Sequence, residues 1–259
     1  MRQVSAILAI AQRDLVKFLR DRGRIVATFI FPFIFVGIMG TSFRYSFGRS
    51  TGFDWLPFIF TGVLAQTLWQ SAAMGIISLL EDRQNDFAQE MFVSPISRYS
   101  IVFGKILGES LVALAQGVGI LGFGLVLGVR FSVGQVLLLL AAAVVICIFG
   151  GAFGLLMISF LSSQRAAQQI FPFIMLPQFF LSGAFTPVAL LPIYLDVLSR
   201  LSPMRYAVDL TRDLFYSGSR DAHRVTLAPT TFNLLVIAVA FAAFMIVGTR
   251  LFVRQERNR

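Results

Sequence analysis

The sequence predicts an all-α membrane protein with six membrane-spanning helices. It also predicts an amphipathic N-terminal interface helix, and short re-entrant or interfacial outer helices between spans five and six. Hydrophobic residues make up 57% of the 259 residues and charged residues only 14%, against roughly 25% charged residues in soluble domains. Several uncharged stretches exceed the roughly 18 apolar residues that a spanning helix needs. Polar segments that contain most of the Lys and Arg residues separate these stretches.

We expect residues 1–259 to form a single transmembrane domain. Residues 1–24 predict a cytoplasmic helix in the membrane interface, because apolar residues such as Ile7, Leu8 and Leu15 recur at helical spacing among charged ones. The remaining elements follow in order. The spans are expected at 25–43, 55–80, 105–129, 135–160, 170–185 and 232–252, a cytoplasmic segment at 81–104, and an extracytoplasmic loop at 186–231.

The distribution of Lys and Arg predicts the orientation. With the N-terminus inside, the inner segments hold 14 of the 22 Lys and Arg residues. Five of the remaining eight lie in the long loop 186–231, and long loops translocate largely regardless of charge. We therefore expect a multi-pass protein of the cell membrane with both termini cytoplasmic.

Two short regions do not follow the simple pattern of spans and loops. The fifth expected span is short and contains Pro172 and Pro177, and the apolar run 190–201 after it is too interrupted to cross a bilayer. That run predicts either a helix in the outer leaflet or a loop helix packed on the ends of the spans. The glycine pairs Gly124/Gly128 and Gly150/Gly154 predict close packing of helices.

The composition argues against several classes of function. The net charge of +9 is explained by cytoplasmic basic segments and anionic lipid, so we expect no nucleic-acid partner. One Cys and one His build neither a disulfide framework nor a metal site. Gly104-Lys105 lacks the first glycine of a phosphate-binding loop, and we expect no catalytic residues.

Ionisable residues within spans usually carry out a function, because they are costly to bury in lipid. The only candidate is Glu109, four residues after Lys105, and pairing on one helix face is the simpler interpretation. An ion-coupled carrier usually needs a carboxylate or His relay near the midplane, which the sequence lacks.

Uncharged polar residues within spans mark a candidate substrate pathway. In the second span Gln66, Trp69 and Gln70 share a face with Gly62 and Ala73, and in the fifth Gln178 and Ser182 share a face beside Phe179. Amides and aromatic rings can line a path for an amphiphile. They can equally hold neighbouring helices together.

The cytoplasmic segment between spans two and three predicts a docking surface. Residues 86–92 can form about two helical turns, which end before Pro95 because proline disfavours helix in the residue before it. A plain connecting loop would not expose Phe87, Met91 and Phe92 to water.

At these residues the chain resembles the membrane subunits of ABC-2 type transporters, in the drug-exporter branch. The segment Phe87-Ala-Gln-Glu-Met-Phe-Val-Ser-Pro-Ile-Ser-Arg98 resembles the coupling helix of that family. The stretches Phe180-Leu-Ser-Gly-Ala-Phe-Thr-Pro187, Leu191-Pro192 and Ser202-Pro-Met-Arg-Tyr206 resemble its signature around the fifth span and the outer helices. Asp86 departs from the family, which often has glycine there, although Asp is an acceptable N-cap.

The resemblance implies a permease subunit of an ATP-driven exporter for a drug or lipid-like amphiphile. Two ATPase subunits, which hold the ATP and Mg, would dock at the coupling helices, and a second identical or different permease would complete the pathway. The second and fifth spans would line it. The ATPase-coupling residues would be Phe87, Gln89, Glu90, Met91, Phe92, Val93, Ser94, Pro95 and Arg98.

Three alternatives remain open. The same type of subunit could export a polysaccharide or a lipid-linked glycan. The chain could be an ion-coupled secondary carrier, which the missing midplane carboxylates argue against. It could also be a membrane scaffold or receptor that transports nothing.

Overall fold

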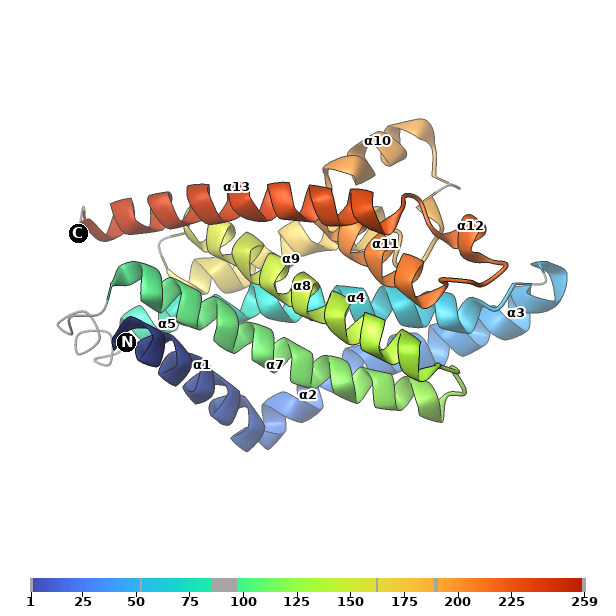
Figure 1. Ribbon diagram of the computed structural model, residues 1–259, viewed down its shortest axis with the longest axis horizontal. Helices are drawn as coiled ribbons and strands as arrows, with labels where there is room; N and C mark the ends of the chain where they lie inside the picture. The colour runs from blue at the N-terminus through green and yellow to red at the C-terminus, as the bar shows by residue number, and fades with distance from the viewer. Residues whose placement is uncertain (1, 52, 85–96, 162, 189–190, 258–259) are drawn as a thin grey trace.

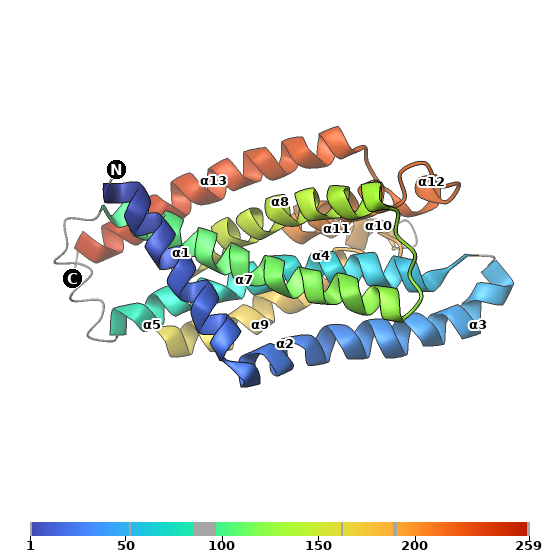
Figure 2. The same cartoon turned by 60° about the horizontal axis from the view of Figure 1, so that its bottom comes forward.

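The computed structural model describes residues 2–51, 53–84, 97–161, 163–188 and 191–257, and these form helices and turns without a β-strand. The predicted all-α class is therefore confirmed. The long helices run along one common axis, while α1 (Arg2–Arg20) crosses the bundle obliquely (Figures 1 and 2). The start of α1 and the end of α13 (Thr230–Arg257) lie at the same end of the molecule (Figure 1).

Within the described residues, five helical stretches are long and apolar enough to cross a membrane: Arg22–Ser46, Trp55–Asp82, Tyr99–Val126, Val133–Ile158 and Ala222–Arg254. They match the first four and the sixth of the expected spans. The fifth expected span falls largely within α9 (Gln164–Leu181), which contains both Pro172 and Pro177. The six-span count and the domain boundaries stay predictions.

The first spanning stretch is one continuous rod made of three helical segments. These are α2 (Arg22–Ile34), the π-helical segment η1 (Phe35–Gly40) and α3 (Thr41–Thr51). The π-helical segment begins three residues after Pro32, which has no backbone N–H to donate, and prolines and π-helical turns are both common sites of irregularity in long helices. The interval 44–54 between the first two expected spans is therefore helical as far as Thr51.

The centre of the bundle is α4 (Trp55–Gly75), which continues through a turn into α5 (Ser78–Gln84). In the most apolar part of this stretch 67% of the residues are buried, against 17% in the first and last spans. Those two spans are thus peripheral and present apolar side chains outward. A methyl group on Gly150 or Gly154 of α8 (Val133–Ile158) would overlap the backbone of Trp69 or Ala73, so this pair allows the predicted close packing.

The other glycine pair has two different roles. A methyl group on Gly124, in α7 (Arg98–Val126), would overlap the ring of Phe60, so this glycine does pack closely. Gly128 has a φ of +88° and no atom within 4 Å of an added Cβ. The packing role predicted for Gly128 is wrong, because it occupies a left-handed turn after α7 that glycine adopts without steric cost.

The segment 186–231, in which the sequence predicts short helices between spans five and six, contains three helices in its described part: α10 (Ile193–Leu201), α11 (Pro203–Phe215) and α12 (Ala222–Val225). Helix α10 keeps an exposed apolar face that includes Ile193 and Leu201. Helix α11 packs between α4, α8 and α13. Arg212 of α11 lies 3.7 Å from the centroid of the Phe58 ring and donates a hydrogen bond of 3.0 Å to the carbonyl of Ala184. This buried helix holds α4, α8 and α13 together.

Candidate functional site

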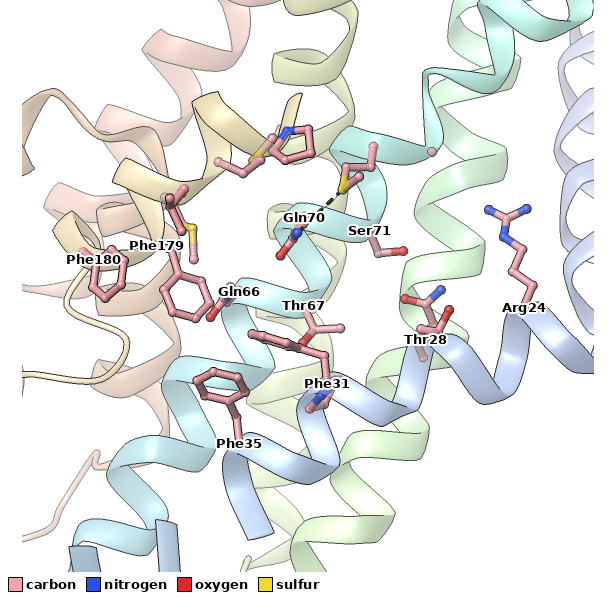
Figure 3. Close-up of a pocket in the computed structure, with 18 residues that line it drawn as sticks. Arg24, Thr28, Phe31, Phe35, Gln66, Thr67, Gln70, Ser71, Phe179 and Phe180 are labelled. Atoms are coloured by element: carbon pink, nitrogen blue, oxygen red, sulfur yellow. Dashed lines mark hydrogen bonds between the residues drawn. The ribbon is translucent and has the colours of Figure 1, made fainter. Parts of the chain in front are cut away.

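A cavity of about 690 Å³ lies beside the central helix, between α2–η1, α4 and α9. Its volume is within the 300–1,000 Å³ of typical ligand pockets. Polar, aromatic and aliphatic side chains line it together (Figure 3). The lining residues are Arg24, Thr28, Phe31, Pro32, Phe35, Gln66, Thr67, Gln70, Ser71, Met74, Gly75, Gln116, Pro172, Met175, Leu176, Phe179, Phe180 and Met204.

The polar part of the wall holds amides that the fold leaves unused. Gln66 is 1% exposed, and neither atom of its amide has a hydrogen-bond partner among the described residues. The side-chain oxygen of Gln116, on α7, is also buried and without a partner there. Among the residues that the structure describes, the amide of Gln70 has the sulfur of Met74 as its partner, at 3.6 Å. Because buried amides normally find partners, the described fold leaves these groups unsatisfied in the cavity wall, where a small rotation of the side chains would turn them to a ligand.

The aromatic part of the wall joins the first span to α9. The ring of Phe31 lies 4.2 Å from that of Phe35 and 5.7 Å from that of Phe179, measured between centroids. Phe179 in turn stacks on Phe185 at 4.4 Å. Figure 3 shows Phe179 and Phe180 at one side of the cavity and Arg24 at the other, with the glutamines between them. The cavity is therefore polar at one end and aromatic at the other.

The polar end rests on a cluster of buried charges. Glu109 of α7 accepts a hydrogen bond of 2.8 Å from Ser78, and its carboxylate lies 3.7 Å from Lys105 and 3.6 Å from Arg24. The ion pair that the spacing of Lys105 and Glu109 predicts is thus present. A methyl group on Gly75 would overlap the Glu109 carboxylate, so this glycine lets the carboxylate reach the edge of the cavity.

The charge cluster extends from the cavity to α1 and α5. The Nζ atom of Lys105 lies 2.8 Å from Asp14 and 3.2 Å from Asp82, and Arg13 pairs with Asp82 at 2.6 Å. Helix α1 comes this close because Gly104 and Gly108 of α7 carry no side chain that would overlap α1. The pKa of Arg13 is raised, because its hydrogen bonds and ion pairs with Asp82 and Asp14 outweigh the effect of burial.

Comparison with known proteins identifies the family. The model of the ABC-2 type transporter family matches residues 5–216. The chain belongs to the ABC-2 type transporter family. It is a multi-pass membrane subunit of an ABC transporter.

Individual relatives agree with this. The putative transport permease ycf38 of Cyanophora paradoxa is 23% identical over 220 residues, which are 83% of this chain and 76% of that protein. The ycf38 protein of Porphyra purpurea is 24% identical over 218 residues, 82% of this chain and 74% of that protein. A probable multidrug ABC transporter permease of Escherichia coli, YbhR, is 29% identical over 175 residues, 65% of this chain and 46% of that protein.

The structure of this ABC-2 subunit brings together half of the residues predicted for the substrate pathway. Gln66, Gln70 and Phe179 line the cavity. Trp69 does not, because it turns toward α8, where its ring lies 4.6 Å from that of Phe149. Gln178 and Ser182 also lie outside the lining; the Ser182 hydroxyl donates to the carbonyl of Phe179 and accepts from the amide of Ala184. Ser182 therefore caps the end of α9.

The predicted ATPase-coupling residues lie outside the described part of this ABC-2 chain, except that Arg98 begins α7. The end of α5 and the start of α7 lie at the same end of the molecule as the start of α1 (Figure 1). Asp82 stands in the described helix that leads into this segment, and it is tied to both α1 and α7 through the charge cluster.

Sequence reasoning missed most of the lining that comes from the first span and from α7. Gln116 lies seven residues after Glu109, on the same face of one helix, and the argument used for polar residues in the second span also applies to it. Phe31 and Phe35 share a helix face in the same way. The sequence does not show that Phe31 and Phe35 line the cavity, because no pattern indicates which face of a lipid-exposed helix meets α9.

Proposed function

We propose that this chain is the permease subunit of an ATP-driven exporter that moves a drug or lipid-like amphiphile out of the cytoplasm or the inner leaflet. The observation that carries the proposal is the cavity, in which unused buried amides and a cluster of aromatic rings face the same space. Such a wall can bind a polar group and an apolar body at once, which is the chemistry of an amphiphile.

The side of entry follows from the exposed rim of the cavity. Leu176 and Phe180 of α9 are 58% and 62% exposed, and Phe31 of α2 is 39% exposed. The cavity thus opens between α2 and α9 on a face of the chain that lipid or a second permease subunit would cover. An amphiphile could enter there from the leaflet without crossing water.

The energy would come from a separate ATPase subunit bound at the cytoplasmic end. The start of α1, the end of α13, the end of α5 and the start of α7 share one end of the bundle (Figure 1), and the basic inner segments favour that end as cytoplasmic. In our proposal two ATPase subunits, holding ATP and Mg, dock at the segment 81–104 of two permease subunits. The multidrug name of the E. coli relative supports a drug as the substrate.

Inside-out membrane vesicles test this function. The chain is co-expressed with the ATPase encoded beside it, and uptake of a fluorescent amphiphile is measured with Mg-ATP or with a non-hydrolysable analogue. We expect accumulation only with Mg-ATP. Uptake that persists without the ATPase, driven by a proton gradient alone, would overturn the proposal in favour of an ion-coupled carrier.

The variant Gln66→Leu tests the pathway in the same vesicles. Removing an amide that has no partner in the described fold should leave folding intact or slightly improve it, whereas it should change the transport rate of polar substrates several-fold. Gln168→Leu is the matched control, because Gln168 is exposed on α9 and does not line the cavity. Loss of folding in Gln66→Leu would indicate that the amide holds helices together.

A further inference from the structure

We propose that the amphiphile carries an anionic head group, which Arg24 binds at the polar end of the cavity in competition with Glu109. This inference deepens the proposed function and rests on it. Three observations support it: the only charged side chain in the described lining is that of Arg24, it lies at one end of the cavity, and its ion pair with Glu109 is long.

The charge that the cavity presents is positive. Arg24 is the only charged residue in the described lining, and its side chain is 39% exposed. Its acidic partner, Glu109, has a side chain only 3% exposed and lies behind Arg24 and Gly75. A ligand in the cavity therefore meets the guanidinium first, and an Arg guanidinium binds phosphate and carboxylate groups through two parallel N–H donors.

The pairing between Arg24 and Glu109 is loose. Their closest N and O atoms are 3.6 Å apart, which is longer than a hydrogen bond between charged groups. That carboxylate oxygen of Glu109 has no hydrogen-bond partner among the described residues, whereas the other oxygen is held by Ser78. Because Glu109 also lies 3.7 Å from Lys105 and accepts a hydrogen bond from Ser78, Arg24 can turn to an anionic head group while the buried carboxylate keeps these two partners.

The depth of the cavity matches the position of an inner-leaflet amphiphile. Arg24 stands in the first turn of α2, near the cytoplasmic boundary of the first span, while Phe35 lies eleven residues further along. This corresponds to roughly 16 Å of helix, or about half of the hydrocarbon thickness of a bilayer. The head group would thus lie at the level of the lipid head groups and the apolar body among the aromatic rings near the midplane. Gln66 and Gln70 lie between these two levels (Figure 3) and would bind the polar linkage.

Binding of three lipids of one chain length tests the proposal on the purified full chain. The probes are phosphatidylglycerol, phosphatidylcholine and a trimethylammonium lipid with the same acyl chains, and native mass spectrometry counts the molecules bound. We expect phosphatidylglycerol to bind tightest. Arg24→Gln should weaken its binding about tenfold, the effect of one lost charge-assisted hydrogen bond. Arg24→Lys should retain most of the affinity.

The control is Arg22→Gln, which removes the same charge from the same helical turn but from an exposed residue outside the lining. It should weaken phosphatidylglycerol binding less than twofold. Glu109→Gln should strengthen that binding, because it removes the competing carboxylate, and a purely structural role of Arg24 would not produce this gain. Equal losses in Arg22→Gln and Arg24→Gln, or tightest binding of the cationic lipid, would overturn the proposal.

The same assay separates this proposal from the proposed function. Gln66→Leu and Phe179→Ala should weaken all three lipids if the cavity is the substrate site, whatever the charge preference. If they do so while the Arg24 variants change nothing, the anionic head group is refuted and the pathway stands. If neither cavity variant affects any lipid, the cavity is not the site and both proposals fail.

Discussion

The Nζ atom of Lys105 lies 2.8 Å from the carboxylate of Asp14, and their side chains are only 3% and 4% exposed. This contact joins the N-terminal helix α1 to the long helix α7. Lys105 also contacts Asp82 of α5, so one ammonium group connects three helices. Charges buried this deeply are tolerated because each has a partner of opposite sign.

Removing one member of this cluster should destabilise the protein strongly. Lys105→Met leaves the carboxylates of Asp14 and Glu109 buried without their shared cation, and breaking a buried pair in this way costs about 3–5 kcal/mol. We expect a clear fall in the melting temperature of the purified protein, measured by tryptophan fluorescence in detergent.

The double variant Asp14→Asn/Lys105→Met tests whether the pair itself is responsible. It should be more stable than Lys105→Met alone, because one of the unpaired carboxylates is then neutral. Asp21→Asn serves as the control, since Asp21 is exposed and outside the cluster. Additive losses in the double variant would show that Asp14 and Lys105 act independently.

The close approach of α8 to α4 should depend on the glycines of α8. In Gly154→Ala the added methyl group would overlap the backbone carbonyl of Ala73, so the helices must separate, at a cost of about 1–3 kcal/mol. Gly122→Ala is the matched control, because no atom lies within 4 Å of its added Cβ, and alanine should slightly favour the helix there. The melting temperature should therefore fall in Gly154→Ala and rise slightly in Gly122→Ala. An unchanged melting temperature in Gly154→Ala would contradict the tight packing of α8 on α4.

The spans were predictable from the sequence because their signal is local. A run such as 135–160 is uncharged and long. In a bilayer such a run must form a helix, because its backbone N–H and C=O groups find no water to bind. The packing of Gly150 and Gly154 was predictable for the same reason, since small residues four apart form one groove. Gly128 shows the limit: the same spacing occurs there, but its glycine serves a turn with positive φ, and spacing alone does not show where a helix ends.

Only half of the predicted cavity residues line the cavity, because its lining depends on which faces of helices distant in sequence meet one another. Gln66 and Trp69 share a face of α4 by helical spacing, yet one meets the cavity and the other meets the rings of α8. The direction of each side chain is decided by which neighbour stands beside it. Arg24 could not be recognised either, because its role follows from the position of Glu109 on another helix.

Helices α10 and α11 should loosen in acid. The pKa of Asp196 is lowered by hydrogen bonds from Arg200 and Arg205, so its ionised form stabilises the junction of α10 and α11. This contribution is present above the ordinary pKa of 3.8 and is lost as the pH falls through the lower folded value. Hydrogen exchange of residues 193–205, corrected for intrinsic rates, should show less protection at about pH 3 than at about pH 6.

The variant Asp196→Asn provides the control for that measurement. It removes the titrating group, and protection of these residues should then be low at both pH values. If the pH dependence persisted in Asp196→Asn, the titration of another group would be responsible.

The last prediction concerns the segment between α5 and α7. The family membership of the chain implies that a soluble partner binds on the cytoplasmic side, and we predict that Phe92 and Glu90 contact it. Phe92→Ser should reduce co-purification of the ATPase several-fold, because it removes an apolar contact from the predicted interface. Glu90→Gln should also reduce it, through loss of a charged partner. The permease itself should stay folded in both variants, which an unchanged melting temperature would show.

Tyr194→Ser is the control for the docking prediction. Tyr194 is an exposed aromatic residue of α10, which projects from the bundle far from the start of α1 (Figure 1). Its loss should leave co-purification unchanged, because the ATPase would bind at the opposite end. Unchanged co-purification in Phe92→Ser and Glu90→Gln would refute the coupling assignment. If Tyr194→Ser also reduced co-purification, the losses in Phe92→Ser and Glu90→Gln would be explained by a weakened fold and not by a lost contact with the ATPase.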